Sequence, residues 1–88
     1  MEIRLLGDSH DVIGFGLAGV DGIDCRTRPE LVAALDAAAR DPQVALVIVS
    51  SRAAALGPDV IARQRESVQL PITVVLPDLP EAEGRHAA

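Results

Sequence analysis

Two continuous apolar runs, Ala45 to Val49 and Ile72 to Leu76, constrain the fold most strongly, because β-branched residues follow one another there with little polar interruption. Such runs are typical of strands that are covered on both faces, as in a parallel sheet. A third apolar run, Ile3 to Leu6, predicts another strand. A more polar candidate at Gly22 to Arg26 suits a sheet edge, where charge on a strand is tolerated. With one aromatic residue among 88, the core must be built from aliphatic side chains.

Helical patterns lie between the predicted strands. They cover Asp11 to Ala18, Pro29 to Arg40 and Pro58 to Val68, and a short turn at Arg52 to Leu56 precedes the last one. Strands that alternate with helices require right-handed crossovers and a parallel sheet. We therefore predict a small flavodoxin-like three-layer α/β fold, with a four-stranded parallel sheet in the order 2-1-3-4 and three flanking helices. Residues 1–77 should form one domain, and residues 78–88 a flexible or extended tail.

The first predicted helix contains the string G-x-G-x-x-G, formed by Gly14, Gly16 and Gly19. In a dinucleotide-binding turn the first glycine directly follows the first strand, but Gly14 comes seven residues after Gly7. These glycines are expected on the body of the helix, with Asp8 as its N-terminal cap, where they cannot present backbone N–H groups to a phosphate. We predict that no nucleotide or other cofactor binds. The glycines are instead expected to allow close approach of the helix to the sheet or to a partner.

The charge pattern and the cysteine content exclude several partner classes. The net charge is −5 and the basic residues, all arginine, are scattered, which argues against nucleic acid or an anionic membrane surface as a direct partner. No segment is long and apolar enough to insert into a membrane, and Glu2 and Arg4 interrupt any signal peptide. The single cysteine, Cys25, is expected as a buried apolar side chain in a reducing compartment. These features predict a cytoplasmic protein.

No catalytic constellation is evident. A phosphoryl-accepting receiver domain shares the predicted layout, but it needs an Asp after the third strand and a Lys after a later one. Here the third strand ends in Ser50 and Ser51, and the chain has no Lys. The serines lack the G-x-S-x-G context of a hydrolase nucleophile and are better explained as helix caps. Asp8 and Asp11, which could bind Mg²⁺ as a loose pair, are likewise better explained by capping. The sequence therefore predicts a binding protein with no metal site.

Several blocks of the sequence together resemble a known family. They are Ile3 to Leu6 followed by Gly7-Asp8, Val12 to Phe15, Leu17 to Val20, Val44 to Val49, Arg52, Arg65, Leu70-Pro71 and Leu76-Pro77-Asp78. Over residues 1 to about 78 the chain is similar to the F subunit of the V-type and A-type rotary ATPases and ATP synthases. The resemblance implies a non-catalytic component of the central rotor stalk that binds the coiled coil of the D subunit. The larger complex would couple ATP to proton or sodium transport at the membrane. The alternative is a homomeric scaffold, or a degenerate receiver-like protein-binding module of the same fold.

The predicted layout also indicates a binding surface. In the order 2-1-3-4, the first helix covers only part of one face, so the third and fourth strands should expose one set of apolar residues there. The candidates are Val47 and Val49 on the third strand with Ile72, Val74 and Leu76 on the fourth, or the opposite set. The D subunit, or a second copy of this chain, would cover this surface. Leu79 and the tail folding back over it is the alternative.

Overall fold

The computed structural model describes residues 1–67 and 69–77, and its strands form where the apolar runs predict them. The strands are β1 (Glu2–Gly7), β2 (Asp21–Asp24), β3 (Val44–Ser50) and β4 (Ile72–Leu76). The helices are α1 (Ser9–Gly16), α2 (Arg28–Arg40), α3 (Ser51–Ala54) and α4 (Pro58–Glu66). The predicted tail and Val68 lie outside the described residues.

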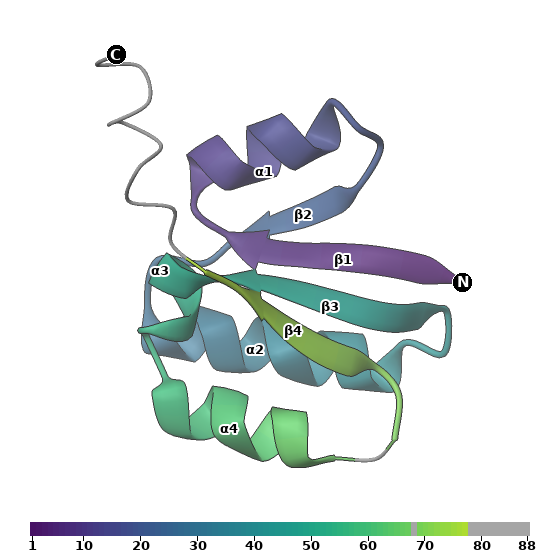
Figure 1. Cartoon of the computed structure of the whole chain (residues 1–88), viewed down its shortest axis with the longest axis vertical. Helices are drawn as coiled ribbons and strands as arrows, with labels where there is room; N and C mark the ends of the chain where they lie inside the picture. The colour runs from purple at the N-terminus through teal and green to yellow at the C-terminus, as the bar shows by residue number, and fades with distance from the viewer. Residues whose placement is uncertain (68, 78–88) are drawn as a thin grey trace.

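The four strands form one parallel sheet in the order β2-β1-β3-β4, so the predicted fold class and strand order are confirmed. Helix α1 lies on one side of the sheet, whereas α2 and α4 lie on the other (Figure 1). Right-handed crossovers produce this distribution, because β2 and β3 lie on opposite sides of β1. The topology therefore leaves the two sheet faces unequally covered.

The main apolar core lies between the sheet and helix α2, with a contribution from α4. Leu31 and Leu35 of α2 and Val47 and Val49 of β3 belong to one buried cluster, which Ile61 of α4 joins. Burial of each large aliphatic side chain contributes about 2 kcal/mol to folding. Leu5 is also fully buried but lies outside this cluster, because it points to the opposite face, toward α1.

The helix ends follow the local capping signals of the sequence. The Asp8 carboxylate accepts a hydrogen bond from the Asp11 backbone N–H at 2.9 Å, so α1 begins at Ser9, slightly before the predicted start. Gly19, at φ +86°, adopts the left-handed conformation that ends this segment before β2. Ser50 caps α3 by accepting a hydrogen bond from the Ala53 backbone N–H at 3.1 Å, which confirms the expected capping role for Ser50, whereas Ser51 is the first residue of the helix.

Candidate functional site

On the α1 side of the sheet, the part formed by β3, β4 and the start of β1 exposes apolar side chains. Ile72 and Val74 of β4 are 58% and 42% exposed, and Ile3 of β1 is 41% exposed. The register pairs Leu46 with Ile72 and Ile48 with Val74, and paired residues of parallel strands share a face. We call this surface the uncovered strip; it consists of Ile3, Leu46, Ile48, Ile72, Val74 and Leu76.

The register corrects half of the predicted binding surface. Val47 and Val49 are fully buried in the core on the α2 side, so the expectation that they are exposed together with Ile72 is wrong. Val47 pairs with Thr73, whose neighbours Ile72 and Val74 point the other way. The strand sequences could not show which residues of β3 share a face with those of β4, because the relative register of two strands depends on the connecting helices. Leu46 and Ile48 take the place of the two valines.

All side chains of the uncovered strip are aliphatic, and none carries charge. Its three most exposed members, together with the partly exposed remainder, present an apolar area on the order of 300 Å², comparable with the largest patch on a typical small monomer. Within the described part of the chain, no helix covers β3 and β4 on this side, as the arrangement in Figure 1 shows. Such a surface is suited to an apolar protein partner.

The glycines of α1 do not approach the sheet, contrary to one of their two predicted roles. A Cβ atom built on Gly14, Gly16 or Gly19 would meet no neighbouring atom within 4 Å. The close helix–sheet approach occurs instead at Gly22 of β2, where a Cβ atom would lie 3.1 Å from the methyl groups of Val12. The helix turns Val12 toward β2, so the glycine required for close packing lies on the strand. Close approach of a partner to α1 stays a prediction.

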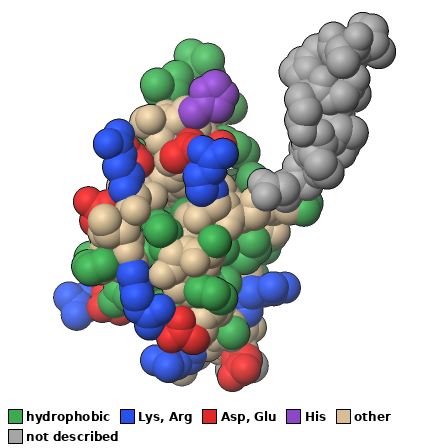
Figure 2. All heavy atoms as spheres, turned by 90° about the vertical axis from the view of Figure 1, so that its left-hand side faces the viewer, with side chains coloured by type: hydrophobic (Ala, Val, Ile, Leu, Met, Phe, Trp, Pro, Cys, Tyr) green, Lys and Arg blue, Asp and Glu red, His purple; other side chains and the backbone are tan. Residues whose placement is uncertain are grey.

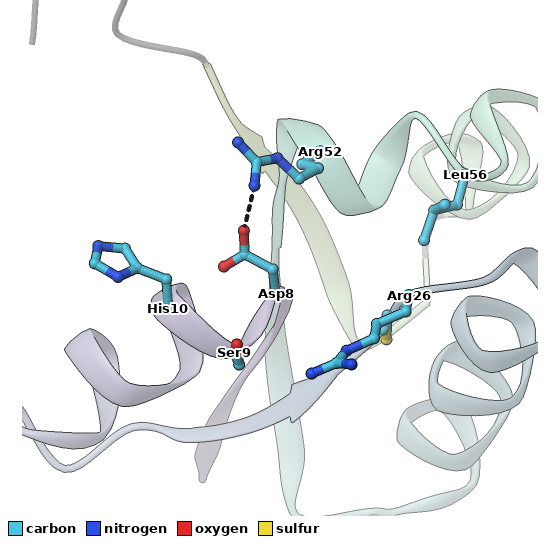
Figure 3. Close-up of a pocket in the computed structure, with 7 residues that line it drawn as sticks. Asp8, Ser9, His10, Arg26, Arg52 and Leu56 are labelled. Carbon is cyan, nitrogen blue, oxygen red and sulfur yellow. Dashed lines mark hydrogen bonds and ion pairs between the residues drawn. The ribbon is translucent and has the colours of Figure 1, made fainter. Parts of the chain in front are cut away.

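A pocket of about 480 Å³ opens at the carboxyl ends of the strands, the edge at which α/β sheets commonly bind ligands. Side chains from the start of α1, the end of β2 and the α3 segment surround it (Figure 3). They are Asp8, Ser9, His10, Cys25, Arg26, Arg52 and Leu56.

Each arginine of the pocket already has an acidic partner. Arg52 Nη1 donates to Asp8 Oδ2 at 2.8 Å, and Arg26 Nε donates to Asp24 Oδ2 at 3.0 Å. The hydrogen bond from the Asp11 backbone, assisted by Arg52, holds the pKa of Asp8 below its usual value. Side chains of both signs are interspersed over this end of the molecule (Figure 2), and the two pairs have no net formal charge. The charge of each arginine is therefore already balanced by a neighbouring carboxylate.

The pocket also lacks an activated nucleophile and a metal site. Burial, together with the nearby charges of Glu30 and Asp24, raises the pKa of the Cys25 thiol, which keeps it protonated and unreactive. Asp11 does not form a metal-binding pair with Asp8, because its carboxylate faces the Asp8 backbone N–H at 3.4 Å. Among residues 1–67 and 69–77, no group of three or more His, Cys, Asp or Glu side chains is arranged to hold a metal ion.

The uncovered strip is thus the stronger candidate site. Sequence reasoning identified its β4 half from the apolar run, included Leu46 and Ile48 only in the opposite set of alternating residues, and missed Ile3. Ile3 alternates with Arg4 along β1, and this alternation was an available signal that the two residues face opposite sides.

No helix within the described residues is long and apolar enough to cross a membrane.

Comparison with known proteins agrees with the resemblance found in the sequence. Residues 3–87 match the family model described as ATP synthase (F/14-kDa) subunit. The fold is similar to the crystal structure of the F subunit of the V-type ATP synthase from Archaeoglobus fulgidus, with a TM-score of 0.72 and 26% sequence identity. The similarity covers 86% of this chain and 96% of the Archaeoglobus chain. A search of curated proteins found no match.

Proposed function

The chain belongs to the family of the ATP synthase (F/14-kDa) subunit, and from that premise we propose that it binds the coiled coil of the D subunit on the central stalk of a V/A-type rotary ATPase or ATP synthase. Members of this family are non-catalytic stalk components of the complex. In this role the chain turns with the stalk at the cytoplasmic side of the membrane. It thereby supports proton or sodium transport coupled to ATP hydrolysis or synthesis in other subunits.

The observation that carries this proposal is the uncovered strip. An aliphatic, uncharged surface on a small protein of net charge −5 favours a partner with a matching apolar stripe. A coiled coil that exposes part of its apolar surface provides such a stripe. The paired charges of the pocket, in contrast, offer little to a substrate.

The buried area that the uncovered strip can provide favours a multi-subunit assembly over a homodimer that uses the strip alone. Removing about 300 Å² of apolar surface from water contributes roughly 7 kcal/mol, which is comparable with the entropic cost of association. Two copies meeting through this strip would bury about 600 Å² in total, less than the roughly 1,200 Å² of a stable standard interface. In a stalk, further contacts with the same partner supply the remaining area. The homomeric scaffold is therefore the weaker alternative.

The degenerate receiver-like module is also a weaker alternative. Ser50 occupies the end of β3, where a receiver domain places its phosphoryl-accepting Asp, and the chain has no Lys. Nothing among the described residues of the carboxyl edge replaces these two groups, because Arg52 is engaged with Asp8. Incubation with acetyl phosphate and Mg²⁺ should leave the intact mass unchanged, and a phosphoryl adduct on an aspartate would revive this interpretation.

The test is to place a charge on the uncovered strip and measure binding to the D-subunit coiled coil encoded in the same genome. Val74→Asp and Ile72→Asp should each weaken binding at least tenfold in a titration of the purified proteins, because a carboxylate would have to be desolvated against apolar side chains. Ala37→Asp is the control, since Ala37 is exposed on α2, which lies on the opposite side of the sheet. Far-UV circular dichroism would verify that each variant is folded. Undiminished binding by both folded strip variants would refute the proposal.

A further inference from the structure

Among the described residues, one position on the α1 side of the sheet has no helix. Helices α2 and α4 cover one face of the four-stranded sheet. Within the described residues, only α1 covers the other face. Neighbouring strands lie about 4.8 Å apart, so β3 and β4 together present a width of roughly 10 Å. This width equals the diameter of one α-helix with its side chains. The part of the uncovered strip on β3 and β4 is therefore the size of a single vacant helix position beside α1.

The flank of α1 that borders this vacant position can be identified from the helix geometry. Val12 faces β2, because its methyl groups contact Gly22. Gly14 lies two residues further on, about 200° around the helix, and so turns away from β2 toward β3 and β4. Gly16 lies four residues after Val12, about 40° around, and stays on the β2 side. A Cβ atom at either glycine would meet open space. By this rotation Gly14, and not Gly16, lies on the flank of α1 that faces the uncovered strip.

Resting on the proposed function, we propose that one amphipathic helix of the partner coiled coil occupies this vacant position, and that Gly14 allows it to pack closely against α1. The incoming helix would pack on the uncovered strip. Because the strip is apolar, that helix must carry an apolar stripe. The five residues of β4 span about 16 Å, which corresponds to roughly three helical turns. A side chain at position 14 would keep the incoming helix away from α1. The apolar stripe of that helix would then lose contact with the uncovered strip.

A second copy of the chain offers no suitable helix among its described residues. Helix α1 and its C-terminal end have exposed apolar side chains at Ile13 and Leu17, but the helix contains only eight residues. Helix α2 buries its apolar residues in the core, and α4 ends with Arg63 and Arg65 in its last turn. No helix among these described residues fits the vacant position, which favours the partner coiled coil as the occupant.

The experiment compares the same substitution on the two flanks of α1. Gly14→Gln is expected to weaken binding of the D-subunit coiled coil at least tenfold, and Gly14→Ala by a smaller factor. Gly16→Gln, the matched control, should leave the dissociation constant within about twofold of the wild-type value. All three replacements favour the helix by intrinsic propensity, so the variants should fold. Circular dichroism and the unchanged Gly16→Gln control verify this.

Each combination of results has a distinct meaning. Undiminished binding by Gly14→Gln, while Val74→Asp abolishes binding, would overturn the vacant-helix inference and leave the proposed function standing. Undiminished binding by both variants would overturn both. A wild-type dimer that Val74→Asp dissociates in sedimentation experiments would assign the strip to a second copy. Hydrogen exchange tests whether residues 78–88 of the same chain cover the strip. They would do so if residues 72–76 are protected from exchange and lose this protection when residues 78–88 are removed.

Discussion

Replacing Asp8 with Ala should destabilise the protein by an amount that the capping geometry sets. Asp8 accepts a hydrogen bond from the Asp11 backbone N–H at 2.9 Å, and an N-cap of this kind contributes about 1 kcal/mol. Its ion pair with Arg52 adds roughly 0.5 kcal/mol at most, because the Arg52 side chain is 80% exposed and solvent screens the pair. The expected loss is about 1.5 kcal/mol, or about 8 °C in Tm for a domain of this size.

The assay is urea denaturation followed by far-UV circular dichroism, since the chain has no Trp or Tyr to report by fluorescence. Asp8→Asn retains a capping oxygen and loses only the charge, so it should cost about 0.5 kcal/mol. Equal destabilisation by the Asn and Ala variants would refute the argument, because the charge rather than the cap would then dominate. A loss of stability below about 0.3 kcal/mol for the Ala variant would also refute the argument.

The pH dependence of Asp8→Ala follows from the lowered pKa of Asp8 in the folded protein. The carboxylate contributes its stability fully above the unfolded-state pKa, and this contribution is lost as the pH falls through the lower folded-state pKa. The difference between wild type and Asp8→Ala should therefore be constant near neutral pH and shrink below about pH 4. A difference that grows on acidification would contradict this assignment.

Two further predictions concern packing and are measured by the same denaturation assay. Leu31→Ala should cost about 3 kcal/mol, because Leu31 is fully buried in the core between α2 and the sheet. A loss below about 1 kcal/mol would mean that the core there is loosely packed. Gly22→Ala should cost roughly 1 kcal/mol, because the new methyl group would lie 3.1 Å from the methyl groups of Val12. In a Val12→Ala background this cost should largely disappear, and a cost that persists would place the strain elsewhere.

The sequence by itself determined the fold class and the strand order. Continuous aliphatic runs such as Ile72–Leu76 predict parallel strands, and helix-length connections then leave the order β2-β1-β3-β4 as the preferred arrangement. Local signals were equally informative at the helix ends, because Asp8, Ser50 and Gly19 act within a few residues of their own positions. The expectation that no helix among residues 1–77 covers β3 and β4 on the α1 side was also based on connectivity alone.

The tertiary structure decided which side chains form the exposed surface. Val47 and Leu46 are adjacent and both aliphatic, yet one is buried in the core and the other belongs to the uncovered strip. A strand buried on both faces carries no alternation that could identify its two sides. Likewise, the glycines of α1 could not be assigned to a flank before the contact between Val12 and Gly22 fixed the rotation of the helix. Register and helix rotation depend on contacts between segments distant in the chain, and so only the folded molecule defines the binding face.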